Sequence, residues 1–349
     1  MKIYFHFCLI FLFSPGLHAQ QAQEVVSIAR MMHDYDWYAR QSQLWQQKVR
    51  QNPQNAHAWL NYYEANRQAR NVNQGKAPVD PGSILTEMGK AIPETYEFHY
   101  LTYRHHGGDV SKFPSLQKAW DLKPGEPKLL DEFVTHYELK RDLTQRKVYN
   151  EKWYQANDLP AENLAYNYNV LMSLRPNAIL ITNGDMDTYP IWMLQDALNI
   201  RTDVLVINRS LIMSPEYADK IFSQEKMPVL ISDKRTFPEI ISHFQTHSNR
   251  PIFFGLTVSQ ATTDRYKDQL YVVGLASLLS EKRIDNEKTL ATNFEKRFQT
   301  EYLLTPLQHI PEKATSRLLT ASYLTPLLML NRYYEEKGQS LKQKAVRKL

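Results

Sequence analysis

The most constraining feature of this sequence is a pair of short apolar runs, each of which ends in a polar turn. Residues 178–182 precede the turn NGDMDTYP at 183–190, and residues 204–207 precede Asn208. Pro190 lies where a helix between the two runs is predicted to begin. A strand, a crossover helix and a second strand form a βαβ unit, whose strands lie parallel. The segment therefore predicts an α/β fold with its polar turns at the carboxyl ends of the strands.

The same alternation continues beyond the first unit. Four apolar runs are expected as strands, at residues 178–182, 204–207, 228–231 and 251–256. Helices are expected near residues 190–199, 215–224, 236–247 and 264–281. Strands that alternate with helices at this spacing form parallel sheets with right-handed crossovers. We therefore predict a small parallel, Rossmann-like sheet within residues 171–285.

Helical patterns flank this domain on both sides. In residues 24–70, Leu44, Trp45 and Val49 lie at helical spacing, and Pro53 separates two predicted helices. Residues 116–124 are similar to the end of a tetratricopeptide (TPR) repeat, because Ala119 permits close helix approach and a proline follows. We predict TPR-like helical hairpins over residues 20–170, with a generic helical bundle as the alternative. The pattern is helical again over residues 286–349.

The first nineteen residues have the features of a secretory signal peptide. Lys2 precedes an apolar run at residues 3–13, and the segment ends in Ala19. The run is too short for an ordinary transmembrane helix, although a retained N-terminal anchor is the alternative. Cys8 is the only cysteine in the chain, so the mature protein is expected to lack disulfides. These features predict an exported, soluble protein of the periplasm or the cell surface.

The formal net charge of +5 is small for 349 residues. Lysine and arginine are dispersed, except in the tail at residues 337–348. A solvated helix end explains this tail better than a nucleic-acid patch does, because exported proteins rarely meet nucleic acid. We therefore expect no nucleic-acid partner.

Polar side chains follow the predicted strands and are candidates for a ligand site. Because parallel strands share a direction, these residues are expected to converge at one sheet edge, where α/β proteins bind ligands. Strand-to-helix turns need the same residue types, since asparagine and glycine tolerate unusual backbone angles and serine, threonine and aspartate cap helices. A purely structural role is therefore the alternative for each. The candidates are Asn183, Gly184, Asp185, Asp187, Thr188, Asn208, Ser210, Thr257 and Ser259.

The Asp185-x-Asp187 pair is the strongest candidate for chemistry. Two carboxylates after a buried strand could hold a divalent cation, as in some nucleotide-sugar glycosyltransferases. Asp34-Tyr35-Asp36 repeats the pattern elsewhere in the chain, and Asp187 would also serve as a helix cap. A divalent cation is thus the one candidate cofactor, because the chain has neither a P-loop nor the glycine spacing of a dinucleotide site.

Residues 183–190, together with Leu194-Gln195 and residues 200–204, resemble a soluble region of large Bacteroidetes membrane proteins. Further similarity lies at residues 253–259 and 271–276, so the resemblance spans roughly residues 160–285. Those proteins carry a multi-pass domain that looks like lipid-linked-sugar glycosyltransferases. No such multi-pass region is found in this sequence, and Met186 replaces a usual asparagine. The resemblance therefore implies a glycosyltransferase-associated accessory module of the cell envelope rather than a shared activity.

Two functions follow as hypotheses. The first is an envelope binding or scaffolding protein, whose helical part holds a protein or glycan partner through aromatic side chains such as Trp37, Trp45, Trp59 and Tyr100. The second is a glycan or nucleotide-sugar enzyme that uses Asp185 and Asp187 at the sheet edge. The sequence favours the first, with no catalytic residue assigned beyond these two candidates.

Overall fold

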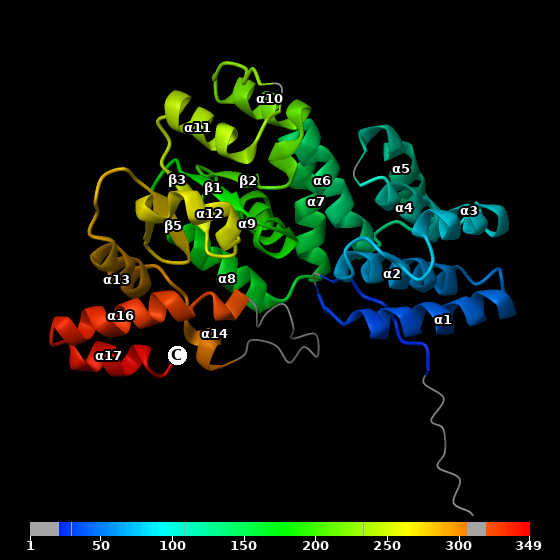
Figure 1. Ribbon diagram of the computed structural model, residues 1–349, viewed down its shortest axis with the longest axis horizontal. Helices are drawn as coiled ribbons and strands as arrows, with labels where there is room; N and C mark the ends of the chain where they lie inside the picture. Colours follow the sequence, from blue (N-terminus) through cyan, green and yellow to red (C-terminus); the bar gives the residue numbers. More distant parts are fainter. Residues whose placement is uncertain (1–20, 29, 108, 233, 306–318) are drawn as a thin grey trace, which may run out of the picture.

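A computed structural model describes residues 21–28, 30–107, 109–232, 234–305 and 319–349. Most of these residues are helical, and one small sheet lies near the middle of the molecule (Figure 1). The predicted signal peptide lies outside the described residues. In the part of the chain that the structure describes, no helix combines the length and apolar character needed to cross a membrane.

The N-terminal half consists of helices that follow one another along the chain. They are α1 (Tyr35–Gln51), α2 (Ala56–Val72), α3 (Pro81–Ala91), α4 (Tyr96–His105), α5 (Phe113–Leu122), α6 (Leu130–Lys140), α7 (Leu143–Ala156) and α8 (Ala161–Met172). Side chains of Asp34, Asn55, Asp80 and Thr95 accept N–H groups at the first four helix starts. The predicted helix pair on either side of Pro53 is confirmed.

The resemblance to TPR repeats stays a prediction. Ala119 is fully buried on α5, as a close helix approach requires. Figure 1 shows α6 and α7 lying between the sheet and the outer helices α1 to α5. The helical character of this half is therefore established, and its repeat family is not.

The sheet contains five short strands. They are β1 (Ile179–Thr182), β2 (Leu205–Asn208), β3 (Ile252–Gly255), β4 (Leu270–Val272) and β5 (Ala276–Leu279). The order is β2-β1-β3-β5-β4, in which β2, β1 and β3 are parallel while β5 and β4 are antiparallel to their neighbours. The prediction of a purely parallel sheet was therefore wrong, and the sheet is mixed.

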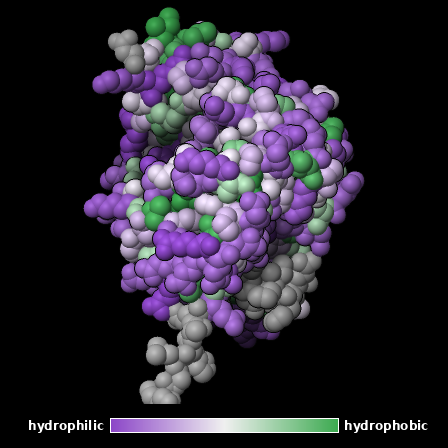
Figure 2. Space-filling view, turned by 90° about the vertical axis from the view of Figure 1, so that its right-hand side faces the viewer, coloured by the Kyte–Doolittle hydropathy of each residue, from purple (hydrophilic) through white to green (hydrophobic). Residues whose placement is uncertain are grey.

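Two predicted elements are replaced by other structure. Residues 228–231 form no strand, because α10 (Pro215–Gln224) and α11 (Phe237–His247) together make the crossover from β2 to β3. Leu230 packs against these helices, whereas Val229 and Ile231 are 59% and 94% exposed. Figure 2 shows hydrophobic side chains gathered at the top of the molecule, at the height of α10 and α11 in Figure 1.

The helix expected at residues 264–281 is also absent. A short 3-10 helix over Asp264–Gln269 leads into β4 and β5 instead. Strand β5 pairs with β3, whose edge would otherwise expose unpaired backbone groups. The long-range pairing thus overrides a local pattern that fits either a helix or two strands.

Helices cover both faces of the sheet, and the strand side chains alternate between them. Leu180, Val206 and Phe253 join a core that includes α9 (Tyr189–Leu198) and the N-terminal helices. Ile181 and Phe254 face the opposite way and join a core formed with α10 and α11. The predicted helices near residues 190–199, 215–224 and 236–247 correspond to α9, α10 and α11, and are confirmed.

The C-terminal part is helical, as predicted. It comprises α13 (Asn286–Lys296), α14 (Glu301–Leu304), α16 (Leu324–Glu336) and α17 (Ser340–Val346). Leu290, Leu330, Tyr334 and Val346 form a small separate core between α13, α16 and α17. In the basic tail, Lys342 Nζ lies 2.7 Å from Glu295 Oε1, which ties α17 to α13.

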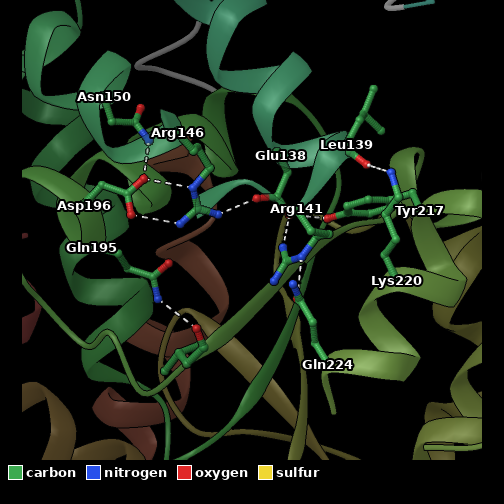
Figure 3. Close-up of polar contacts among 11 residues, drawn as sticks. Glu138, Leu139, Arg141, Arg146, Asn150, Gln195, Asp196, Tyr217, Lys220 and Gln224 are labelled. Atoms are coloured by element: carbon green, nitrogen blue, oxygen red, sulfur yellow. Dashed lines mark hydrogen bonds and ion pairs between the residues drawn. The ribbon is translucent and has the colours of Figure 1, made fainter. Parts of the chain in front are cut away.

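A buried ion network connects the N-terminal helices to the α/β part (Figure 3). Arg146 Nε and Nη2 on α7 each lie 2.9 Å from a carboxylate oxygen of Asp196 on α9. The same guanidinium binds Glu138 on α6, which also accepts hydrogen bonds from Arg141 and from the Tyr217 hydroxyl on α10. Glu138 is fully buried, and nearby guanidinium groups hold its pKa below the ordinary value against the effect of burial.

Replacing Glu138 with glutamine should lower the free energy of unfolding by about 3–5 kcal/mol, because Arg141 and Arg146 lose their shared buried counter-charge. Urea denaturation followed by circular dichroism measures this loss. Glu87→Gln is the control, since the Glu87–Lys90 pair is exposed and its loss should cost about 0.5 kcal/mol or less. Equal losses for the two variants would contradict the role assigned to the network.

Candidate functional site

The three parallel strands end at one sheet edge, where most of the predicted ligand residues meet. After β1 the chain forms a 3-10 turn over Asp185–Asp187 and then enters α9. Asp187 is 5% exposed and accepts hydrogen bonds from the backbone N–H groups of Asn183 (2.8 Å) and Gly184 (2.7 Å). Its Oδ2 also accepts the hydroxyl of Thr257, which follows β3. Asp187 therefore joins β1 to β3 as a turn cap.

Thr188 and Asn208 complete this arrangement. The Thr188 hydroxyl lies 2.7 Å from the Thr182 hydroxyl and accepts the Asn208 side-chain amide at 3.0 Å. The side-chain oxygen Oδ1 of Asn208 in turn accepts hydrogen bonds from the backbone N–H groups of Ser210 and Leu211. These polar groups satisfy one another at the ends of β1 and β2, so turn chemistry accounts for them.

The side chains of the remaining candidates take no part in this hydrogen-bonded group. The exposed Ser259 begins the short helix α12 (Gln260–Thr263), where its hydroxyl contacts that of Thr262. Ser210 is exposed, and its described hydrogen bonds are made by its backbone: the N–H donates to Asn208 Oδ1, and the carbonyl oxygen accepts the N–H of Met213. Asp185 is also exposed, which separates it from Asp187 although both carboxylates lie in the same turn.

Asp185 lies toward the N-terminal helices. Although the Asp185 side chain is partly accessible to solvent, desolvation by the surrounding protein raises the pKa of its carboxyl group. The guanidinium of Arg104 on α4 opposes this shift, and Asp187 adds to it. Asp131 on α6 is affected in turn: burial, Glu132 and Asp185 raise its pKa to about 8, while Arg104 lowers it. The carboxylates of Asp185 and Asp131 are therefore electrostatic neighbours, although one belongs to the sheet edge and the other to the helical half.

Arg104 is the main cation at this junction. Its Nη1 lies 2.7 Å from Glu132 Oε1, and its Nε lies 3.2 Å from Glu64 Oε1 on α2. The guanidinium carbon lies 5.6 Å from the centre of the Tyr100 ring. A second contact joins the halves here, since the Thr135 hydroxyl on α6 lies 2.6 Å from the Tyr189 hydroxyl on α9.

A cavity of about 90 Å³ adjoins this charged group. Its wall combines the N-terminal segment with α2, α4, α6 and α7, and most of its lining side chains are polar or charged. The lining residues are Glu24, Val25, Val26, Ser27, Arg30, Leu60, Asn61, Glu64, Tyr100, Arg104, Pro127, Lys128, Asp131, Trp153 and Asp158.

Sequence reasoning missed Glu64, Arg104 and Asp131. Each lies on a helix, where a single charged residue usually indicates a solvent-exposed face, and no motif links the three. Only the packing of α2, α4 and α6 brings them together. The one signal in the sequence was the sheet edge itself, which correctly indicated where Asp185 would lie.

Among the described residues, no group of three or more His, Cys, Asp or Glu side chains is arranged to hold a metal ion. Both oxygens of Asp187 already accept protein donors. His243 is 8% exposed, and its Nε2 lies 2.8 Å from the carbonyl oxygen of Pro228. The chemistry available at the junction is therefore that of carboxyl groups and a guanidinium.

Comparison with known protein families gives a match to part of the chain. Residues 161–236 match the family model of TMEM260-associated domain 2. The matched region runs from α8 through β1, the Asp185–Asp187 turn, α9, β2 and α10, and ends just before α11. No curated protein matches the chain. The match fits the resemblance to a membrane-protein family, and this chain is similar to that family over the part of the fold that carries the sheet edge.

Asp187→Asn should lower the free energy of unfolding by about 1–3 kcal/mol, because the new amide places N–H donors against a backbone N–H or the Thr257 hydroxyl. Asp185→Asn, two residues away, should leave stability nearly unchanged or slightly higher, since it removes an exposed carboxylate whose charged form partial desolvation disfavours. Chemical denaturation of both variants makes the comparison. A larger loss for Asp185→Asn would reverse the roles assigned to the two carboxylates.

The raised pKa of Asp131 predicts a pH-dependent stability. The folded state keeps a proton up to about pH 8, whereas the unfolded chain releases it near the ordinary value of 3.8. This group's contribution to stability is thus fully present below about pH 4 and is lost as the pH rises to about 8. Asp131→Asn should therefore raise the Tm at pH 9 and much less at pH 4, as measured by differential scanning fluorimetry. The same Tm difference at both pH values would contradict this assignment.

Proposed function

We propose that this protein is a binding or scaffolding component of the cell envelope, which holds its partner at the junction of the helical half and the sheet edge. The observation that carries the proposal is a cavity lined by Asp131, Arg104 and Glu64, from three helices far apart in the sequence, whose charged groups interact electrostatically with Asp185 at the sheet edge. Ligand sites in α/β proteins collect at the carboxyl ends of the strands, and Asp185 lies there.

The chemistry of the junction suits a hydroxyl-rich or polypeptide partner. Carboxyl oxygens accept hydrogen bonds from hydroxyl and amide groups, a protonated Asp131 can also donate one, and Arg104 supplies a cation beside them. Trp153 and Tyr100 add ring surface to the cavity wall. A cavity of about 90 Å³ holds about six to nine water molecules, which is comparable to a single sugar ring or one peptide side chain.

The aromatic side chains of the helical part, which the sequence suggested as the partner surface, are mostly buried. Trp45, Trp59 and Tyr100 are 5–7% exposed and belong to the core, while Trp37 remains partly exposed. Rings buried to this extent mainly stabilise the helix packing and do not form an open aromatic surface, although Tyr100 also forms part of the cavity wall. The proposed surface is therefore the charged junction, with protein or glycan as the partner class.

The cellular setting is part of the same proposal. Residues 1–19 have the pattern of a secretory signal peptide, and the turn at residues 183–190 resembles that of Bacteroidetes envelope proteins. We therefore infer export to the periplasm or to the cell surface, and an accessory role beside glycosyltransferase-like membrane proteins.

An enzyme of glycan or nucleotide-sugar chemistry is the second candidate, and Asp185 is the observation that favours it. An accessible carboxyl group with a raised pKa beside a second carboxyl group can serve as a general acid or base. Asp187 cannot share this role in the described arrangement, because its oxygens are occupied. The enzyme hypothesis thus depends on Asp185 with Asp131 rather than on the Asp-x-Asp pair.

A thermal-shift screen of residues 20–349 with short glycans, nucleotide sugars and divalent cations tests whether the junction binds a ligand. We expect at least one glycan to raise the Tm, and Asp131→Asn or Asp185→Asn to reduce that shift because each removes an acceptor for ligand hydroxyls. Asp36→Asn, an exposed change on α1, is the control and should keep the full shift.

Turnover of a nucleotide sugar that is lost in Asp185→Asn would favour the enzyme over the binding protein. A ligand shift that is equal in Asp131→Asn, Asp185→Asn and Asp36→Asn would place the binding site elsewhere and overturn the proposal for the junction.

A further inference from the structure

The described chain begins with residues 21–28, which run along α1 and α2 without helix or strand and enter a turn at Ser27 (Figure 1). Three side chains of those helices hold its backbone. Gln41 Oε1 accepts the N–H of Gln23 at 2.8 Å, and Trp45 Nε1 donates to the carbonyl oxygen of Gln23 at 2.8 Å. Asn61 Oδ1 accepts the N–H of Val25 at 2.7 Å.

These contacts have the geometry of a bound peptide. Gln41, Trp45 and Asn61 are 3%, 6% and 2% exposed, so their polar groups are buried and directed at the segment's main chain. Asn61 is fixed in this orientation, because its amide nitrogen donates to the carbonyl oxygen of His57 at 2.9 Å. Contacts to main-chain groups select an extended backbone and impose little requirement on side chains.

Side chains of the segment add one apolar anchor and one ion pair. Val25 is 6% exposed and joins the main core, whereas Gln21, Gln23 and Glu24 are exposed. The Glu24 carboxylate lies 2.9 Å from Lys128 Nζ. Just beyond the segment, Arg30 pairs with Asp158, and the exposed Met32 precedes α1. A short stretch of chain therefore links the segment to its first helix.

We propose that the surface formed by Gln41, Trp45 and Asn61 is a groove for an extended polypeptide, and that residues 21–28 occupy it in cis. This inference rests on the proposed binding function and names its partner class. Val25, Val26 and Ser27 also form one wall of the cavity beside Asp131 and Arg104. Departure of the segment thus opens that cavity, so the occupant of the groove controls access to the charged junction.

A tethered segment competes strongly with a free peptide, because its effective concentration is on the order of millimolar. A test therefore cuts the tether while keeping the whole chain. A protease site inserted after Met32 allows cleavage of the folded protein, and a fluorescent synthetic peptide of residues 21–31 then reports exchange by fluorescence anisotropy. We expect saturable binding to the cleaved protein and at least tenfold weaker binding to the uncleaved protein.

Matched variants identify the groove. Gln41→Ala should raise the Kd of the labelled peptide about tenfold, as the loss of a buried acceptor predicts. Gln47→Ala, an exposed glutamine on the same helix, should leave the Kd unchanged. A peptide with aspartate in place of Val25 should fail to bind, and Val25→Asp in the uncleaved chain should increase binding of the labelled peptide.

Three results would overturn the inference: unfolding of the protein on cleavage, a folded cleaved protein that does not exchange its segment, or equal effects of Gln41→Ala and Gln47→Ala. Each would make residues 21–28 a permanent structural strap. The glycan screen with Asp131→Asn is a separate measurement. If peptide exchange fails, that screen still decides whether the proposed function holds.

Discussion

The buried network around Glu138 and Arg146 is the interaction on which the rest of the structure depends. It joins α6 and α7 of the helical half to α9 and α10 of the α/β part, and every charge in it has an opposite charge as partner. Buried charges tolerate little displacement, because an unpaired one costs several kcal/mol. The network thus fixes the position of α6, and α6 in turn carries Asp131 to the sheet edge.

The surroundings of Asp185 and Asp187 give these two neighbouring carboxyl groups different roles. Asp187 accepts two backbone N–H groups and the Thr257 hydroxyl, so it holds β1 against β3. Asp185 is accessible, its pKa is influenced by Arg104, and its charge raises the pKa of Asp131 across the junction. The turn that the sequence singled out is therefore both a structural element and one side of a site, and the other side comes from the helical half.

Prediction succeeded where local interactions decide the structure. Helices α9, α10 and α11 begin at proline or capping residues and have clear apolar faces, so their positions were predictable. The errors fell at residues 228–231 and 264–281, whose short apolar patterns fit several structures. Whether such a run becomes a strand depends on long-range pairing: β5 pairs with the edge of β3, whereas residues 228–231 connect α10 to α11 and stay unpaired although β2 is an edge strand.

The sequence by itself determined the helical flanks, the βαβ unit and the position of Asp185 at a strand end, because these follow from spacing, capping and turn chemistry within a few residues. Only the tertiary structure decided that the sheet is mixed, that Asp131 and Arg104 approach Asp185, and that residues 21–28 lie against Gln41 and Asn61. The reason is physical: each of these depends on contacts between segments far apart in the chain, which form only when the helices and the sheet pack together.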